Sequence, residues 1–142
     1  MAINFYSEGI NFKPKQIQKL KSWIKNVAAE EGFLVGNLNY VFCNDEYILE
    51  VNKKYLNHDY YTDIITFDYT SSKKIGGDLV VSIDTIKSNS ILLNVDLNTE
   101  VCRVIIHGVL HLCGYKDKSD EEERNMRLKE DYYLTKFDYI II

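Results

Sequence analysis

The stretch His107-Gly-Val-Leu-His111-Leu-Cys-Gly114-Tyr-Lys-Asp117 places two histidines, a glycine and an acid in the order of a metal-binding helix and turn. Side chains four residues apart lie on the same side of a helix, so both imidazoles can reach one ion. Gly114 can adopt the left-handed conformation that ends a helix, which allows Asp117 to return to that ion. Three protein ligands with one open position are typical of catalytic zinc. The stretch therefore predicts one zinc ion held by His107, His111 and Asp117.

The residues around the two histidines are almost all apolar, and they predict a central, buried helix over residues 97–113. A lone histidine in such a helix is more often a core residue that hydrogen-bonds a carbonyl or a carboxylate. Two histidines at this spacing, followed by glycine and an acid, favour metal binding instead. Glu100 lies on the same stripe of the helix. It is expected either to orient a metal ligand without binding the ion itself or to pair locally as a buried carboxylate.

Outward from this helix, the hydrophobic periodicity alternates between strand and helix. Pro14 is expected at the start of the first helix, and Gly76 and Gly77 are expected to precede the last strand. The pattern predicts an α+β fold: a single compact domain over residues 1–142, with a mixed sheet of about four strands, about five helices and the ligand-bearing helix at the centre. The expected strands cover residues 2–6, 38–42, 63–68 and 78–83, and the expected helices cover residues 14–31, 44–55, 84–93, 97–113 and 119–134.

Length and composition favour one soluble domain. The chain has 142 residues, which is enough to bury one core, and it has no apolar run of transmembrane length. The N-terminus lacks the pattern of a secretory signal, and the three cysteines are far apart, as expected of reduced thiols in a cytoplasmic protein. The net charge of −4 argues mildly against broad, non-specific nucleic-acid binding. Five lysines in residues 13–25 form either a local basic surface or the solvated face of a helix, and the second reading is favoured.

The order of two histidines, a glycine and a third ligand resembles the helix and turn of the metzincin proteases. Those proteases carry a glutamate, their general base, directly after the first histidine. Here that position is Gly108. The sequence therefore disfavours a peptidase with ordinary zincin chemistry.

Four segments together resemble the YbeY family of bacterial rRNA maturation factors. His-Gly-x-Leu-His-Leu-x-Gly-Tyr at residues 107–115 looks like the signature of this family. Residues 51–55, 62–67 and 77–82 are similar to the family's Leu-Asn-x-x-Tyr, Thr-Asp-Val-Leu-Ser-Phe and Gly-Asp-Ile segments. Glu100, seven residues before the first histidine, also matches.

The resemblance implies a zinc-dependent, single-strand-specific endoribonuclease. It further implies a role in 3′-end maturation of 16S rRNA and in ribosome quality control, with single-stranded RNA and the small ribosomal subunit as partners and no membrane. Two alternatives stay open. The first alternative is a non-catalytic ribosome assembly factor, which binds the subunit or a partner GTPase and has a structural zinc. The second alternative is another metal-dependent hydrolase.

Two positions depart from the family pattern. Asp117 stands where the family usually has a third histidine, and a carboxylate there neutralises one positive charge of the ion and makes it a weaker electrophile. Leu56 stands where the family typically has an arginine that is thought to meet phosphate. Lys53, Lys54 and His58 are the nearest substitutes by sequence and are the expected substrate-binding residues. Exposed tyrosines, such as the pair at 60–61, are expected to stack on bases or simply to pack.

Overall fold

Four strands and five helices make up the part of the chain that the computed structural model describes, residues 2–58 and 62–137. The strands are β1 (Ala2–Glu8), β2 (Leu34–Cys43), β3 (Ile64–Asp68) and β4 (Lys74–Ser82). The helices are α1 (Ile17–Glu30), α2 (Asp45–Leu56), α3 (Ile83–Leu93), α4 (Leu97–Leu112) and α5 (Asp120–Leu134). The structure confirms the expected α+β class and the four-stranded mixed sheet with five helices.

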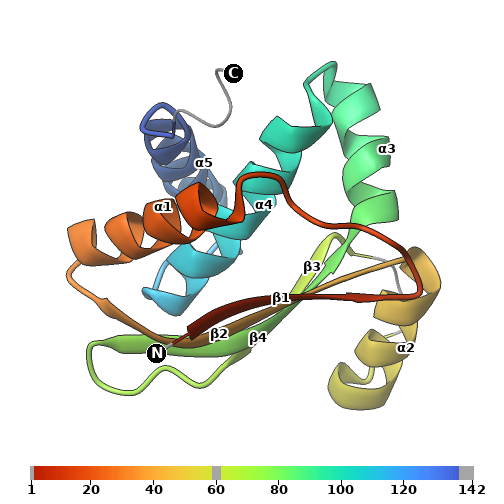
Figure 1. Ribbon diagram of the computed structural model, residues 1–142, viewed down its shortest axis with the longest axis horizontal. Coiled ribbons are helices and arrows are strands. Elements are labelled where there is room, and N and C mark those ends of the chain that lie inside the picture. Colours follow the sequence, from red (N-terminus) through yellow and green to blue (C-terminus); the bar gives the residue numbers. More distant parts are fainter. Residues whose placement is uncertain (1, 59–61, 138–142) are drawn as a thin grey trace.

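The sheet has the strand order β1-β2-β4-β3. The first three strands in this order are parallel, and β3 runs antiparallel to β4 along the outer edge. Figure 1 shows α1, α4 and α5 on one face of the sheet and α2 at one end of the other face. The alternation of β2 matches this arrangement, because Leu38, Tyr40 and Phe42 are fully buried in the main core. Asn39 and Val41 point to the opposite face and are only half-buried.

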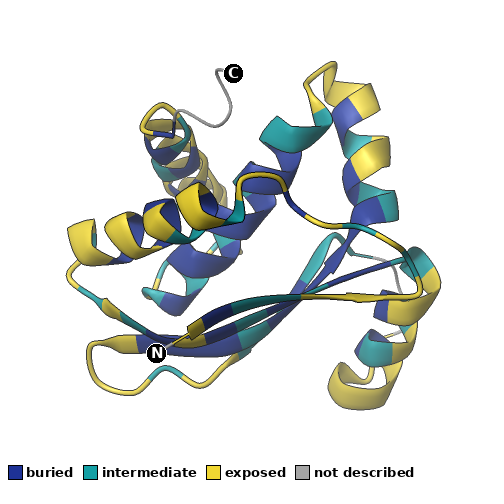
Figure 2. Ribbon diagram, in the orientation of Figure 1, coloured by how far each residue is buried: buried dark blue, intermediate teal, exposed yellow. Residues whose placement is uncertain are grey.

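Helix α4 is the centre of the main core. Figure 2 shows it buried along most of its length, between the sheet and the outer helices. Gly108 allows this close packing: a Cβ atom there would lie 2.3 Å from Cδ2 of Leu79 and 3.1 Å from Cδ1 of Ile64. The glycine that disfavours zincin chemistry is therefore the residue that lets the ligand-bearing helix lie directly on the sheet.

Two details of the expected elements are wrong. Helix α1 begins at Ile17 and not at Pro14, because Gln16 before it adopts a left-handed conformation with φ 50°. Gly76 and Gly77 lie inside β4 and do not precede it. A Cβ atom on Gly77 would lie 2.4 Å from the carbonyl oxygen of Phe67, so glycine is what allows β3 to pair closely at this point.

The cysteines are free thiols, as expected. Burial raises the pKa of Cys43, Cys102 and Cys113 to about 12, so these thiols are poor nucleophiles near neutral pH. Within the described residues, the helices are too short or too polar to cross a lipid bilayer.

Candidate metal centre and its clefts

The three predicted ligands meet at one point. Helix α4 ends at Leu112, Gly114 follows with φ 106°, and the chain turns back so that Asp117 faces the last turns of the helix. The Oδ2 atom of Asp117 lies 3.2 Å from Nε2 of His107 and 3.4 Å from Nε2 of His111. The three ligand atoms lie within 4.8 Å of one another, and all three side chains are half-buried.

These distances fit a small divalent ion. Two ligand atoms about 2.0–2.1 Å from a tetrahedral zinc ion lie about 3.3 Å from each other. In addition, a neutral imidazole that donates through Nδ1 presents a lone pair at Nε2. Two such lone pairs directed at one carboxylate oxygen are repelled by its negative charge unless a proton or a cation lies between them. The donor set of two imidazoles and one carboxylate is also one that zinc accepts.

The side of His107 away from this point is held by an acid from α5. Its Nδ1 atom lies 2.6 Å from Oε2 of Glu130, a residue that is only 4% exposed. Arg103 donates to the other oxygen of Glu130 at 3.1 Å and to Asp131 at 2.9 Å. Burial disfavours the charged form of His107, but the hydrogen bond and the charge of Glu130 outweigh it, so the pKa of His107 is raised.

The side of His111 away from the site is held by the turn itself. Its Nδ1 atom lies 2.9 Å from the carbonyl oxygen of Tyr115. A carbonyl only accepts, so Nδ1 carries the proton and Nε2 of the neutral ring is free for a metal ion. The hydroxyl of Tyr115 donates to Oε1 of Glu31 at 2.8 Å, which ties the turn to the end of α1. Glu31 also accepts from Tyr133 and from Lys129.

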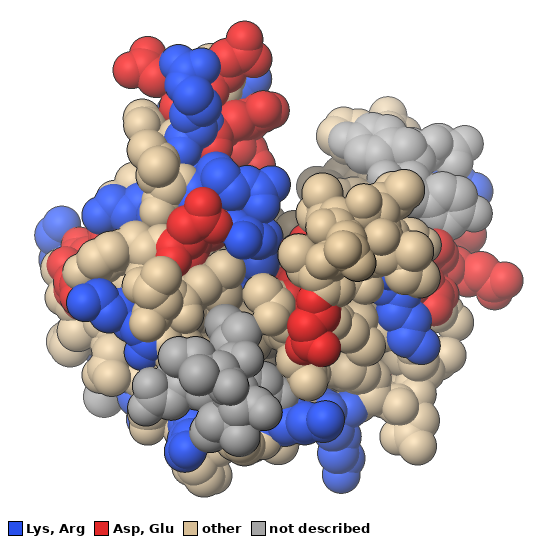
Figure 3. Space-filling model, turned by 90° about the horizontal axis from the view of Figure 1, so that it is seen from above, with Lys and Arg blue, Asp and Glu red and all other residues tan. Residues whose placement is uncertain are grey.

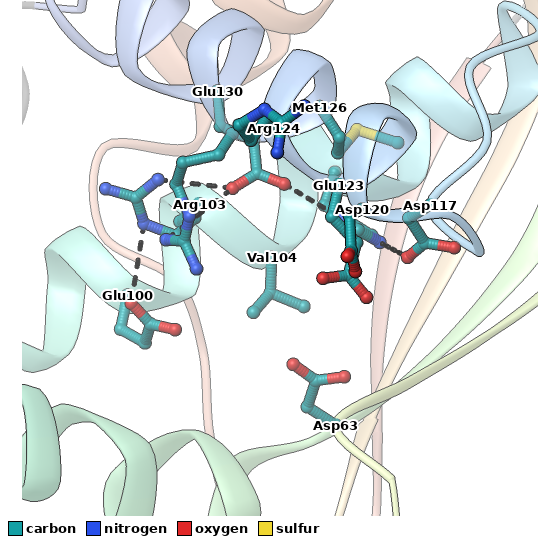
Figure 4. Close-up of a pocket in the computed structure, with 12 residues that line it drawn as sticks. Asp63, Glu100, Arg103, Val104, Asp117, Asp120, Glu123, Arg124, Met126 and Glu130 are labelled. Atoms are coloured by element: carbon teal, nitrogen blue, oxygen red, sulfur yellow. Dashed lines mark hydrogen bonds and ion pairs between the residues drawn. The ribbon is translucent and has the colours of Figure 1, made fainter.

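The candidate centre lies between two clefts. The histidine cleft, of about 520 Å³, lies against α2 and β3 and is lined by His58, Asp63, His107, His111 and Asp117, among others. The arginine cleft, of about 540 Å³, lies between α4 and α5. Arg103, Arg124 and Arg127 line it together with several acids, and Figure 4 shows Arg103 between Glu100 and Glu130. His107 and Asp117 line both clefts, so one substrate can reach the centre from either side.

Asp63 also lines both clefts, and Figure 4 shows its carboxylate directed into the arginine cleft from the sheet side. Burial raises the pKa of Asp63, and the nearby charge of His107 partly offsets this effect. A carboxyl group with a raised pKa beside a candidate metal ligand suits proton transfer.

The other predicted residues fall in three different places. Glu100 is buried in the arginine cleft, where its Oε1 lies 3.6 Å from Nε of Arg103, and within the described residues no hydrogen bond joins it to His107. Burial raises the pKa of Glu100, and among the buried side-chain atoms of the described residues its Oε1 lacks a hydrogen-bond partner. His58 lines the histidine cleft. Lys53 and Lys54 are exposed on α2, outside both clefts, and the expected stacking tyrosines at 60–61 lie outside the described residues.

The sequence did not predict Glu130 or Glu31 as supports of the site. A signal for Glu130 exists, because Met126, Glu130 and Tyr133 recur at helical spacing and are the buried residues of an otherwise polar α5. An acid on the buried stripe of a helix needs a partner. Glu31 offers no such signal, since its partners lie 84 to 102 residues away in the sequence.

The surface around the site does not have one sign of charge. Figure 3 shows acidic and basic side chains interspersed over the face seen from above. This distribution fits the net charge of −4 and favours recognition in clefts over broad electrostatic attachment to nucleic acid.

The fold and the site define an α+β protein with a three-ligand candidate metal centre on its central helix. The family model described as Endoribonuclease YbeY matches residues 2–138. A protein of Parabacteroides distasonis named Endoribonuclease YbeY is 50% identical over 134 residues, which are 94% of each chain. One of the same name from Bacteroides thetaiotaomicron is 47% identical, over 94% of this chain and 98% of its own.

The chain therefore belongs to the YbeY family of endoribonucleases, which confirms the expected family. The solution structure of TM1509 from Thermotoga maritima shares the fold, with a TM-score of 0.68 and 24% identity over 96% of this chain and 89% of that one.

Proposed function

We propose that this chain is a zinc-dependent endoribonuclease that cleaves single-stranded RNA at the centre formed by His107, His111 and Asp117. The observation that supports it most is the orientation of the two histidines. Each Nδ1 is held by its own partner, Glu130 or the Tyr115 carbonyl, and each Nε2 is directed at the same carboxylate oxygen. Such partners fix the tautomer and the ring orientation of metal-ligating histidines.

The zinc ion and the residues around it have separate roles in the proposed cleavage. A bound zinc ion would polarise a phosphate oxygen and favour deprotonation of an attacking hydroxyl or water. Asp63, which faces both clefts beside His107, is assigned to proton transfer. Arg124 and Arg127 line the arginine cleft, where their guanidinium groups can pair with phosphates on one side of the cleaved bond.

The RNA that we propose as substrate is that of the small ribosomal subunit. The support is membership of the YbeY family together with the two clefts that meet at the centre, which suit an extended single strand. We propose 3′-end maturation of 16S rRNA and ribosome quality control in the cytoplasm as the setting, with ribosome-associated proteins as partners.

The test compares RNA cleavage by the wild type, His111→Ala and Asp117→Ala, purified identically. We expect both variants to lose at least about a hundredfold in rate, because each removes a metal ligand. Zinc should restore the activity of chelator-treated wild type only. Equal rates in all three proteins would point to a contaminating nuclease and would contradict the proposal.

One observation favours a second function, that of a non-catalytic assembly factor with a structural zinc. Leu56, where the family typically has an arginine, lines the histidine cleft and is 42% exposed, so an apolar side chain occupies that wall. A variant that folds and binds zinc but does not cleave RNA separates the two functions. If such a variant supports ribosome maturation in cells as well as the wild type does, the assembly role is the correct one.

A further inference from the structure

A third cleft lies on the opposite side of the sheet from α1, α4 and α5. Strand alternation brings Tyr6 of β1, Asn39 and Val41 of β2, Asp78 of β4 and Phe67 of β3 to this face. Helix α2 covers only one end of the face, where Ile48 packs on Cys43, Ile65 and Val80. The uncovered remainder forms a cleft of about 510 Å³.

The walls of this cleft are aromatic. Tyr6, Tyr47, Tyr55, Phe67 and Tyr69 line it, and we call it the aromatic cleft. Tyr6, Tyr55 and Tyr69 are 52%, 61% and 64% exposed, so most of their ring surface is in water. Tyr55 and Phe67 meet edge to face, with ring centroids 5.8 Å apart. Clustered exposed rings of this kind mark a binding surface rather than a core.

The floor of the aromatic cleft is partly apolar, at Val41 and Val80, and partly polar, at Asn39 and Asp78. Asn4 donates to Asn39 at 3.1 Å, and Asn39 donates to Asp78 at 3.1 Å, which makes a ladder across β1, β2 and β4. The charge of Asp78 raises the pKa of the Tyr69 hydroxyl beside it. A carboxylate on the floor repels phosphate but accepts from the N–H groups of a base edge. The floor therefore suits bases, with the sugar-phosphate backbone directed outward.

The aromatic cleft continues toward the candidate metal centre. At the end of α2, neighbouring residues line different clefts: Tyr55 lines the aromatic cleft, and Leu56 lines the histidine cleft. At the end of β3, Asp68 lines the histidine cleft and Tyr69 the aromatic cleft. The two clefts thus lie on either side of the edge strand β3. At the rim, Nζ of Lys54 lies 5.3 Å from the centroid of the Tyr55 ring, where a cation can meet a phosphate.

We infer that the aromatic cleft binds bases of single-stranded RNA, stacked on Tyr55, Tyr69 and Tyr6, while the strand passes around β3 to the candidate metal centre. This inference rests on the proposed function, because the ligand is the substrate of that function. Aromatic rings stack on any base, so the cleft supplies affinity with little sequence preference. It also favours single strands, because bases in a duplex are not free to stack on a protein.

The test is RNA binding in the full chain that carries His111→Ala, so that cleavage does not interfere. The probe is a fluorescein-labelled, single-stranded oligouridylate, with fluorescence anisotropy as the readout. Tyr55→Ala combined with Tyr69→Ala should weaken binding by about 30-fold or more, which is the lower end of the loss expected when two stacking rings are removed. Tyr55→Phe with Tyr69→Phe keeps the rings and should bind within about twofold of the parent, since the stacking surface is unchanged.

Two controls separate this site from general effects. Tyr132→Ala removes a tyrosine of α5 that is 43% exposed and lies outside the aromatic cleft, so binding should not change. A duplex RNA of the same length should bind weakly and should not respond to the tyrosine variants. Thermal unfolding checks that the variants fold, which is expected because both replaced side chains are exposed.

Binding of the single strand that is unchanged in the double alanine variant would overturn the inference. An equal loss for duplex RNA would also overturn it. Failure of the proposed function looks different: the wild type would not cleave RNA, but binding would still depend on the two rings. If wild-type cleavage is metal-dependent and the affinity for single-stranded RNA does not depend on the two rings, only the inference about the aromatic cleft is wrong.

Discussion

The Nδ1 atom of His107 lies 2.6 Å from Oε2 of Glu130, so a buried acid on α5 fixes a candidate metal ligand on α4. The two residues are 23 positions apart, and they join the two helices at the centre of the proposed active site. Glu130 in turn is held by Arg103. The orientation of His107 thus depends on the packing of α5 as well as on its own helix.

Glu130→Gln should weaken zinc binding by about 10- to 100-fold, because the neutral amide holds the ring less firmly and makes it less basic. Calorimetric titration of the metal-free protein measures this change. Asp131→Asn is the matched control, since Asp131 contacts Arg103 but not His107. An unchanged zinc affinity in Glu130→Gln would show that the contact does not support the metal centre.

The stability of the metal-free protein should fall as the pH rises above 6.5. The pKa of His107 is raised in the folded state, mainly because Glu130 outweighs the effect of burial. A raised pKa stabilises the fold fully below the ordinary value of 6.5, and this contribution is lost as the pH rises through the folded-state pKa. Urea unfolding in the presence of chelator measures the trend.

With zinc the direction should reverse, because the metal ion binds the deprotonated imidazole and competes with protons. The fall in stability should also be smaller in Glu130→Gln. If the metal-free wild type gains stability over the same pH range, the raised pKa of His107 is wrong.

Glu31→Gln should lower the free energy of unfolding by about 1–3 kcal/mol, because a half-buried acceptor of three hydrogen bonds loses its charge. Burial opposes the ionisation of Glu31, but the bonds from Tyr133, Tyr115 and Lys129 outweigh it and lower its pKa. The contribution of Glu31 is therefore present above its ordinary pKa of 4.5 and is lost as the pH falls below that value.

The same variant should weaken zinc binding slightly, since Glu31 anchors Tyr115, whose carbonyl holds His111. Denaturant unfolding at neutral and acidic pH, followed by zinc titration, gives both quantities. Glu50→Gln, on an exposed residue of α2, is the control. Loss of stability that is equal at all pH values would argue against the ionised form of Glu31.

Leu56→Arg should raise the rate of RNA cleavage by roughly tenfold, because it adds a positive charge to the wall of the histidine cleft where a phosphate would lie. Leu56→Gln changes the polarity without the charge and should leave the rate nearly unchanged. Single-turnover cleavage of a labelled RNA measures both. A rate in Leu56→Arg no higher than in Leu56→Gln would mean that the substrate phosphate does not pass this wall.

The parts of the fold that the sequence predicted are those that depend on local periodicity. Helix α4 was predicted as Leu97–Cys113 and ends one residue earlier, and Ser119 caps α5 with Glu122 as the capping-box pattern indicated. The meeting of the three candidate ligands was equally predictable, because they come from one helix and the turn after it. The supports of the site were not predicted, since Glu130 reaches His107 and Glu31 reaches Tyr115 only through tertiary packing.

The substrate surfaces show the same limit. Sequence proximity pointed to Lys53, Lys54 and His58, but only His58 lies in the cleft beside the candidate centre. The aromatic cleft collects residues from four strands, one helix and a loop, and no local pattern connects them. Strand order and the position of α2 decide which side chains meet there.

The most direct test of the metal centre is a zinc titration of the metal-free protein, followed by NMR of the imidazole nitrogens of His107 and His111. The geometry predicts one zinc ion per chain, a large shift of both Nε2 signals, and Nδ1 atoms that keep their protons toward Glu130 and Tyr115. Asp117→Ala should weaken this binding. Zinc that binds through Nδ1, or that leaves both Nε2 signals unchanged, would contradict the account.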